Sequence, residues 1–522
     1  MKKILKGALI LVLCAMFFAA CGTTEKSAAT DGANEEKTVK SDKQAAKEQQ
    51  KAEKQKAKEK KKAGKSKEAK SGSYLVPINQ AVADGEYEDA YALLSDETTK
   101  AYLGSDDVYN MDAGMVKLYA DDIPGAISHL SPVSDMDKLN EKYAGADKVV
   151  LSTFFADEYS RPYVTYDYED IYAILFDAVT KLGSEDKNTA DSAFQDLKKV
   201  QEMLLAMDQY NEILSKKMNE AGKLGDDTTK NLPKPANIAY HNSALANYLA
   251  LIYNKYNEER EGDQRNHYYN EMAAAYGQDS YAGQSMPASV AIEKESVPAG
   301  KARLNVLALM GLMAEKVEHG QETGLPTDFI ASKIVENDQI KNANLNISSI
   351  LGKLSVFTTI RAVYTELKDR TTLNGPCVVT INGTDYALET IENTSEIAKK
   401  CIARKQYIAS RRSIFRTSIK SIPMFVSYIL LPDPATIANP ITKKAAEASI
   451  GSAGDKIRTA LMNDHADIRG AHYYPAEVQA AGIELDPGTY EVTVKFPGQK
   501  PITKSVEVKA GKLNLLEVEC LK

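Results

Sequence analysis

The sequence predicts a mainly α-helical protein with an α+β C-terminal part. Three observations support this fold class. Apolar and small residues recur with helical spacing, in units about 36 residues apart, in the first half of the chain. The dipeptide Asn382-Gly383 lies between two short strand-like runs, and apolar and polar residues alternate after Pro487-Gly488. We therefore expect a tetratricopeptide-like helical-repeat domain at 74–290, a mixed α/β region with a basic helix at 291–445, and a small antiparallel β unit at 446–522.

Residues 1–20 have the pattern of a bacterial lipoprotein signal peptide. Three lysines precede an apolar run from Ala8 to Phe18, and Ala19-Ala20-Cys21-Gly22 is a cleavage site of small residues. In such proteins the cysteine becomes the first residue and carries two or more acyl chains, each worth about 0.8 kcal/mol per buried CH₂. We expect lipid on Cys21 to anchor the chain to a membrane. An uncleaved anchor helix and an ordinary secretory peptide are the alternatives, and all three place the chain outside the cytoplasm.

Residues 21–73 are predicted to form a disordered tether. The segment is built from Lys, Glu, Ala, Gln and Ser, and has almost no large apolar residue with which to offset the entropy of ordering. Residues 37–70 hold fourteen lysines against five acids, a net charge of +9, whereas residues 71–522 carry −16. An acidic body on a basic tether does not suit nucleic-acid binding, so we expect no nucleic acid as a partner.

Helix-turn-helix units begin the predicted repeat domain. The first has Ala81, Gly85 and Ala90 at its turn and helix contacts, and a similar unit extends from Leu118 to Leu130. Small alanines at such positions let paired helices approach closely. Two more degenerate units cover 168–207 and 244–276. An irregular helical domain without a true repeat is the alternative.

Strands and one long helix are expected in the mixed region. Leu304 to Met310 is apolar on both faces, so it is either a strand buried on both sides or the start of a buried helix. Leu354 to Ile360 is a second expected strand, and Asn382-Gly383 predicts a hairpin turn. Periodicity predicts a helix over Glu392 to Lys420, which Pro423 should end. Its apolar face would contain Ile397, Cys401, Ile408, Phe415 and Ile419.

Three strands are expected in the last 40 residues. Apolar side chains alternate from Tyr490 to Phe496, and Pro497-Gly498 then predicts a turn. Ser505 to Val508 should return along the first strand, and Leu513 to Cys520 should follow as the last. This pattern is typical of an antiparallel sheet with one face buried.

The predicted helix is basic although the body is acidic. From Lys399 to Lys420 it has eight positive charges and no acid. Either these side chains are solvated or paired within the protein, or they face anionic headgroups or an acidic partner. The candidate partner or anion contacts are Arg404, Arg411, Arg412 and Arg416.

No catalytic or cofactor-binding motif is recognisable. The six His are scattered, and the nearest approach to a metal cluster is His465, Asp467 and His472. On a helix the two His would lie about 10 Å apart along the axis, so we expect no metal and no other cofactor. Asp467 and Arg469 are instead expected to tie the loop that leads into the β unit through charge-assisted hydrogen bonds. Three cysteines follow Cys21, namely Cys377, Cys401 and Cys520. One disulfide is possible among them, and the sequence does not indicate which two would pair.

Three passages resemble an uncharacterised family of bacterial lipoproteins that combine helical repeats with a C-terminal β region. They are Ala156 to Tyr163 with Tyr166 to Glu169, Leu354 to Lys420, and Ala466 to Arg469 with Tyr474 to Val478 and Pro487-Gly488. Members tend to carry a Trp after the Asp-x-Arg element, where this chain has Gly470 to Tyr473. The resemblance marks Asp467, Arg469 and Pro475 as motif residues with a structural role. Members are often encoded beside lipoproteins that activate penicillin-binding proteins, which implies a role in the cell envelope.

These observations predict a lipid-anchored, non-enzymatic scaffold that binds an unidentified envelope protein in cell-wall synthesis or envelope assembly. In a cell with two membranes we expect it on the periplasmic face of the outer membrane. A lipoprotein that captures an extracytoplasmic ligand or glycan is the first alternative. The chain has 28 Tyr but no Trp, the residue most prominent in sugar stacking, which weakens that alternative. A cell-wall-processing enzyme is the second.

Overall fold

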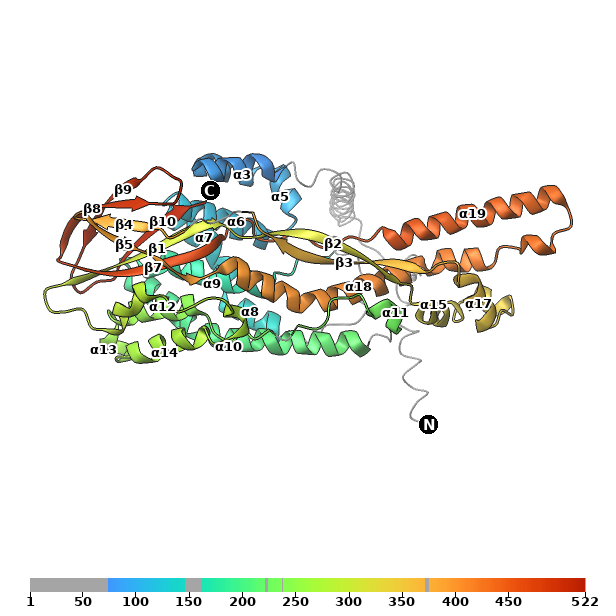
Figure 1. Cartoon of the computed structure of the whole chain (residues 1–522), viewed down its shortest axis with the longest axis horizontal. Coiled ribbons are helices and arrows are strands. Elements are labelled where there is room, and N and C mark those ends of the chain that lie inside the picture. The colour runs from blue at the N-terminus through green and yellow to red at the C-terminus, as the bar shows by residue number, and fades with distance from the viewer. Residues whose placement is uncertain (1–73, 146–160, 221–223, 237, 371–374, 522) are drawn as a thin grey trace, which may run out of the picture. The chain divides into compact units, whose positions relative to one another are not determined.

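The computed structural model describes residues 74–145, 161–220, 224–236, 238–370 and 375–521. The predicted signal peptide at 1–20, Cys21 and the predicted tether at 21–73 lie outside the described residues. By their contacts, residues Lys70–Lys522 form one compact unit. In this unit the helices come first and the strands concentrate in the C-terminal part (Figure 1), which confirms a mainly α fold with an α+β C-terminal part.

The first two expected helix-turn-helix units form as pairs of helices. Gly85, at φ 77°, ends the first helix in the left-handed conformation, and Asp121, at φ 58°, occupies the turn of the later pair. Asp122 then caps the following helix by accepting from Gly125 N at 3.0 Å. The helices of this region are α3 (Leu75–Asp84), α4 (Tyr87–Ser95), α5 (Glu97–Leu103), α6 (Asp106–Tyr119), α7 (Ile123–Ser134) and α8 (Met136–Ala144).

Two buried helices and one long helix complete the helical part. α9 (Asp167–Leu182) and α12 (Ala244–Asn254) are buried on nearly every side, whereas α10 (Lys187–Glu220) buries one face. Ser243 caps α12 by accepting from Ala246 N at 3.1 Å. The shorter elements are α11 (Asp226–Thr229), α13 (Glu258–Glu261), α14 (Arg265–Ala275), η5 (Asp279–Tyr281) and η6 (Ala288–Lys294).

Two four-stranded sheets pack face to face through a shared apolar core. The first has the order β10 (Asn514–Cys520), β1 (Ala302–Leu312), β7 (Pro475–Leu485) and β6 (Glu389–Glu392). The second has the order β5 (Thr384–Ala387), β4 (Val378–Ile381), β8 (Gly488–Lys495) and β9 (Ile502–Val508). The second sheet is antiparallel throughout, whereas β1 and β10 of the first are parallel.

The first sheet forms the middle of three layers. Leu304 and Val306 of β1 face the second sheet, and Leu307 and Leu309 face the core that contains the helices. The strand interpretation of Leu304 to Met310 is therefore confirmed, with both faces buried. The expected hairpin turn is confirmed too, because Asn382 and Gly383 between β4 and β5 have φ of 51° and 79°.

A two-stranded ribbon packs along the longest helix. The ribbon consists of β2 (Glu315–Gly324) and β3 (Thr359–Lys368), and β3 contacts α18 (Thr394–Ile429), as Figure 1 shows. α19 (Pro440–Met462) returns along α18 after the short turn η7 (Pro434–Thr436). The core here also includes residues of α15 (Thr327–Ile334), α16 (Asp338–Asn342) and α17 (Ile347–Leu354).

Two local expectations were wrong. Pro423 does not end the helix, because α18 continues to Ile429 with Phe425, Val426 and Ile429 buried, and this packing outweighs the hydrogen bond that proline cannot donate. The strand expected at Leu354 to Ile360 starts only at Thr359, because Leu354 belongs to the apolar face of α17.

The expected boundary at residue 445 does not separate the sheets. β7 and β10, from the region expected to be a small β unit, pair with β1 of the preceding region. β8 pairs in the same way with β4. The start of the expected β unit, residues 446–462, belongs to helix α19. Strands from both sides of residue 445 therefore make each sheet.

Candidate functional site

Helix α9 begins with three buried carboxylates, Asp167, Glu169 and Asp170. The sequence Asp-Tyr-Glu-Asp places them in the first helical turn, where unpaired N–H groups and the helix dipole favour negative charge. A buried carboxylate also needs a partner, because it has lost its hydration. The surroundings of this turn are the candidate functional site.

A lysine from a different part of the chain pairs with each carboxylate. The pairs are Asp167 with Lys405 of α18 at 2.8 Å, Glu169 with Lys316 of β2 at 2.7 Å, and Asp170 with Lys142 of α8. The three ion pairs join α9 to two helices and to the ribbon. Charge at this site therefore holds distant segments of the chain together.

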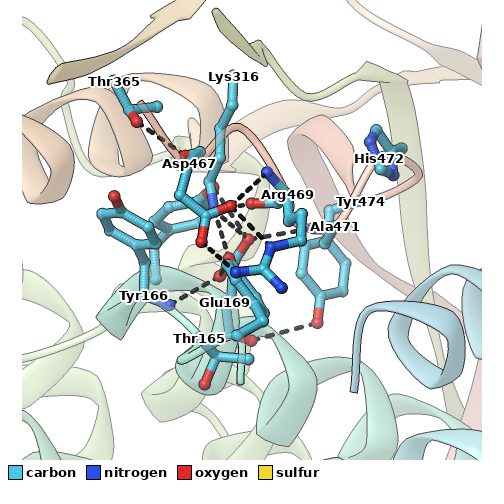
Figure 2. A network of polar contacts seen from close by, with 12 residues as sticks. Thr165, Tyr166, Glu169, Lys316, Thr365, Asp467, Arg469, Ala471, His472 and Tyr474 are labelled. Atoms are coloured by element: carbon cyan, nitrogen blue, oxygen red, sulfur yellow. Dashed lines mark hydrogen bonds and ion pairs between the residues drawn. The ribbon is translucent and has the colours of Figure 1, made fainter. Parts of the chain in front are cut away.

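Glu169 has the fullest set of partners (Figure 2). In addition to Lys316, its carboxylate accepts hydrogen bonds from Tyr163 OH at 2.5 Å, Tyr166 N at 2.7 Å and Ala471 N at 3.1 Å. Burial acts to raise the pKa of Glu169, but the Lys316 ammonium and these donors outweigh burial and hold that pKa below its usual value. Glu169 is thus an internal charge whose hydrogen-bonding capacity is filled.

The segment that leads into β7 supplies the second half of the site. Arg469 donates to both carboxylate oxygens of Asp467, from Nε at 2.9 Å and from a terminal nitrogen at 2.7 Å. This bidentate pair is the charge-assisted tie that the sequence led us to expect. Thr365 Oγ1 donates to Asp467 O and Lys316 Nζ donates to Arg469 O, both at 2.9 Å, so the segment is fastened to β3 and β2 (Figure 2).

The following residues enter the helical part. His472 donates from its backbone N to Asp112 Oδ1 at 2.6 Å, and its Nδ1 lies 2.7 Å from Asp112 Oδ2. Tyr474 is fully buried. Pro475 begins β7, and its carbonyl accepts from Thr394 Oγ1 at the start of α18. The loop from His472 to Pro475 therefore connects a buried carboxylate of α6 to the first sheet and to α18.

The candidate arginines of α18 mostly point into the protein. Arg416 is 2% exposed and donates to both oxygens of Asp464, at 3.0 and 2.6 Å. Arg404 pairs with an aspartate of α10, Arg411 is buried, and Arg412 is half-buried. The prediction that Arg411 and Arg416 contact an external anion is wrong, because both side chains are buried. Neighbouring elements, including α10, α15, α19 and β3, cover α18. Pairing within the protein is what the structure shows for Arg404 and Arg416.

The two C-terminal histidines have separate partners. His465 Nδ1 lies 3.1 Å from Glu318 Oε2 on the ribbon, whereas His472 contacts Asp112 of α6. Among the residues that the structure describes, no group of three or more His, Cys, Asp or Glu side chains could hold a metal ion. Cys377, Cys401 and Cys520 are buried free thiols in this part of the chain, and burial raises the pKa of Cys377 to about 12.

One helical segment in the described part of the chain, Thr394–Thr436, has the length and composition of a membrane span. Half of its apolar window is buried inside the protein. α18 also contributes to three apolar cores. Core packing explains this hydropathy, so the segment is weak evidence for a membrane span.

Comparisons of the chain with protein-family models, with curated proteins and with solved structures gave no match.

Sequence reasoning found half of this site. The sequence predicted a structural role for Asp467, Arg469 and Pro475. Tyr166 to Glu169 belonged to one of the passages that carry the family resemblance. The lysine partners Lys316 and Lys142 were missed, because a lone lysine in a strand or helix looks like a solvated residue. Asp-Tyr-Glu-Asp at the start of an otherwise apolar helix was the available signal for buried ion pairs.

Proposed function

We propose that this chain is a lipid-anchored cell-envelope protein that acts as a non-enzymatic protein-interaction scaffold, with tetratricopeptide-like repeats in its helical part. Its place would be cell-wall synthesis or envelope assembly, on the periplasmic face of the outer membrane where the cell has two membranes. The membrane partner is reached through lipid on Cys21, and the protein partner is an unidentified envelope protein.

One observation carries the scaffold role: the three buried carboxylates in the first turn of α9 are each paired with a lysine from another element. A catalytic carboxylate or lysine needs access to substrate and a free lone pair or proton. Lys316 is 3% exposed at its side chain and donates to Glu169, Tyr163 and Arg469 O. Charged groups arranged in this way stabilise the packing of helices against sheets. This arrangement favours the proposal that the protein is a rigid scaffold for partner binding.

The first experiment tests the anchor. Cys21→Ser should abolish metabolic labelling with palmitate and leave the leader uncut, which intact mass will show. A wild-type protein that has no lipid and an unchanged mass would exclude the lipoprotein proposal. Fractionation of the wild-type protein then locates the membrane.

The second experiment tests partner binding without disturbing the fold. A photo-crosslinking residue replaces the exposed apolar side chains Val76, Leu93 or Leu205 of the helical part, and Ile502 of β9 is the matched control. Leu205 and Ile502 have nearly equal exposure, 44% and 43%. We expect a discrete crosslinked protein from one or more helical positions and none from Ile502. The same products at all four positions would contradict a binding surface on the repeats.

A further inference from the structure

The connection between α18 and α19 exposes large apolar side chains to solvent. Residues 428–441, which we call the hairpin tip, join the two helices. From Ser421 to Thr442 only Asp433 is charged. Leu430 is 38% exposed and Ile441 is 82% exposed. Side chains of this kind are disfavoured in water, so the hairpin tip has the composition of a contact surface.

Backbone polar groups of the hairpin tip are satisfied by nearby side chains. Lys353 of α17 donates to the carbonyls of Ile429 and Leu431 at 2.5 and 3.2 Å, at the end of α18. Asp433 accepts from Ala435 N at 2.9 Å. Asn439 caps α19 in the same way. Its Oδ1 accepts hydrogen bonds from Ile441 N at 2.9 Å and from Thr442 N at 3.1 Å. Such caps lower the cost of moving helix ends out of water.

Charges next to the hairpin tip suit an anionic surface. Lys443 and Lys444 are exposed near the start of α19, two and three residues after Ile441. Lysines that flank exposed apolar residues are typical of segments that lie in the headgroup region of a bilayer. Tyr428, half-buried at the base of the tip, has the side chain that is enriched at this level of a membrane. The preceding turns of α18 bury Phe425, Val426 and Ile429 in an apolar core of the protein, so the hairpin tip would lie in the interface and α18 would not cross the bilayer.

We propose that the hairpin tip inserts into the interfacial layer of an anionic lipid bilayer. Ile441 and Leu430 enter the acyl boundary, and Lys443 and Lys444 contact lipid phosphates. This membrane contact does not depend on lipid at Cys21. It would give the folded body a fixed orientation on the surface, which a lipid on a long tether does not.

The absence of Trp from the chain permits a direct test. A single Trp replaces Ile441 in one variant and Ile502, 43% exposed on β9, in the control variant. Both variants use residues 70–522, the compact unit, so that neither an acyl chain nor the basic tether contributes. Vesicles contain phosphatidylcholine and phosphatidylglycerol with brominated acyl chains. We expect a blue shift and quenching for Ile441→Trp and no change for Ile502→Trp.

A second arm tests the lysines. In the Ile441→Trp variant, Lys443→Gln with Lys444→Gln should weaken partition to these vesicles roughly 30-fold. Equal thermal stability of the variants with and without these two changes will show that folding is unaffected. Vesicles of phosphatidylcholine alone should bind weakly.

Two outcomes would overturn the proposal. One is a Trp at position 441 that stays unquenched by anionic vesicles, or that is quenched no more than Trp at position 502. The other is a blue shift that depends on protein concentration without vesicles, which would make a second copy of this chain the occupant of the hairpin tip. Failure here would leave the Cys21 anchor untouched, because the tested chain lacks that residue.

Discussion

Glu169 and Lys316 form a buried ion pair. The additional hydrogen bonds to Glu169 are needed for this pair to stabilise the fold. Moving two charges out of water costs several kcal/mol, and the attraction between them repays this cost only where further hydrogen bonds complete the site. Glu169 accepts from Tyr163, Tyr166 N and Ala471 N in addition to Lys316. Loss of either charge leaves the other without its main partner.

Lys316→Met should therefore reduce the free energy of unfolding by about 3–5 kcal/mol. The uncompensated Glu169 carboxylate is the reason, since methionine fills a similar volume. Urea unfolding followed by circular dichroism will measure the change. The double variant Lys316→Met with Glu169→Gln should lose clearly less than the sum of the two single variants. Additive losses would show that the pair is not coupled.

Glu392 is a buried carboxylate of the opposite kind. Its partners are neutral: Ser243 Oγ and Leu245 N donate at 2.9 Å, and Tyr281 OH donates at 2.7 Å. Burial raises the pKa of Glu392, and these hydrogen bonds offset the effect only in part. The folded state consequently keeps a proton that the unfolded chain releases near pH 4.3.

Stability from Glu392 is present in full below about pH 4.3 and is lost as pH rises through the higher folded-state pKa. We expect the wild-type protein to lose stability over this range relative to Glu392→Gln, which does not titrate. The difference in free energy of unfolding between the two, measured by urea at several pH values from 4 to 8, is the test. A difference that does not change with pH would mean that Glu392 has an ordinary pKa in the folded protein.

At the scale of elements, β7 passes so close to η6 that only glycine fits at position 482. A Cβ there would lie 1.8 Å from Glu293 Oε1 and 2.9 Å from Ile292 Cγ2. Glu293 cannot move away easily, because it pairs with Lys255 and accepts from Asn305 Nδ2 at 2.8 Å. The glycine thus lets the strand and the buried carboxylate pack together.

Gly482→Ala should destabilise the protein by roughly 1–3 kcal/mol or more. Gly451 of α19 is the matched control, because nothing lies within 4 Å of a Cβ added there. Gly451→Ala should raise stability by up to about 1 kcal/mol through helix propensity. Thermal unfolding of both variants will give the two signs. If Gly482→Ala is neutral, Glu293 can shift and the contact is not rigid.

The elements that the sequence predicted well are those whose signals are local. Asn382-Gly383 needs only its own two residues to form a hairpin turn, and Gly85 likewise ends a helix by its own conformation. The prediction that Pro423 ends the helix was wrong, because the burial of Phe425 and Val426 outweighs the tendency of proline to end a helix. Local signals therefore determined turns and caps but not the length of α18.

For the whole molecule, the sequence indicated the mainly α class but not which strands pair. β10 pairs with β1 across some 200 intervening residues, and no local pattern specifies this partner. The candidate site has the same character, since Glu169, Lys316 and Ala471 N meet from three distant segments. The sequence predicted the pair of Asp467 and Arg469, which are two residues apart, but not the ion pairs between distant segments.

The contacts of the loop from His472 to Pro475 imply that the helical part and the sheets unfold together. Asp112 of α6 is fully buried, and its partners are the backbone N and Nδ1 of His472. His472→Ala would leave Asp112 Oδ2 without that partner and should cost about 1–3 kcal/mol. His465→Ala, which loses only a partly exposed contact with Glu318, should change stability by no more than about 0.5 kcal/mol.

Calorimetry of residues 70–522 will show whether this coupling extends through the unit. We expect a single transition for the wild-type protein, and His472→Ala should move the whole transition to lower temperature, because the loop joins α6, α18 and the first sheet. Two resolved transitions, with only one of them shifted by His472→Ala, would show that the helices and sheets are independently stable. In that case residues 74–290 would fold alone, and the contacts of His472 would hold together two domains that have already folded.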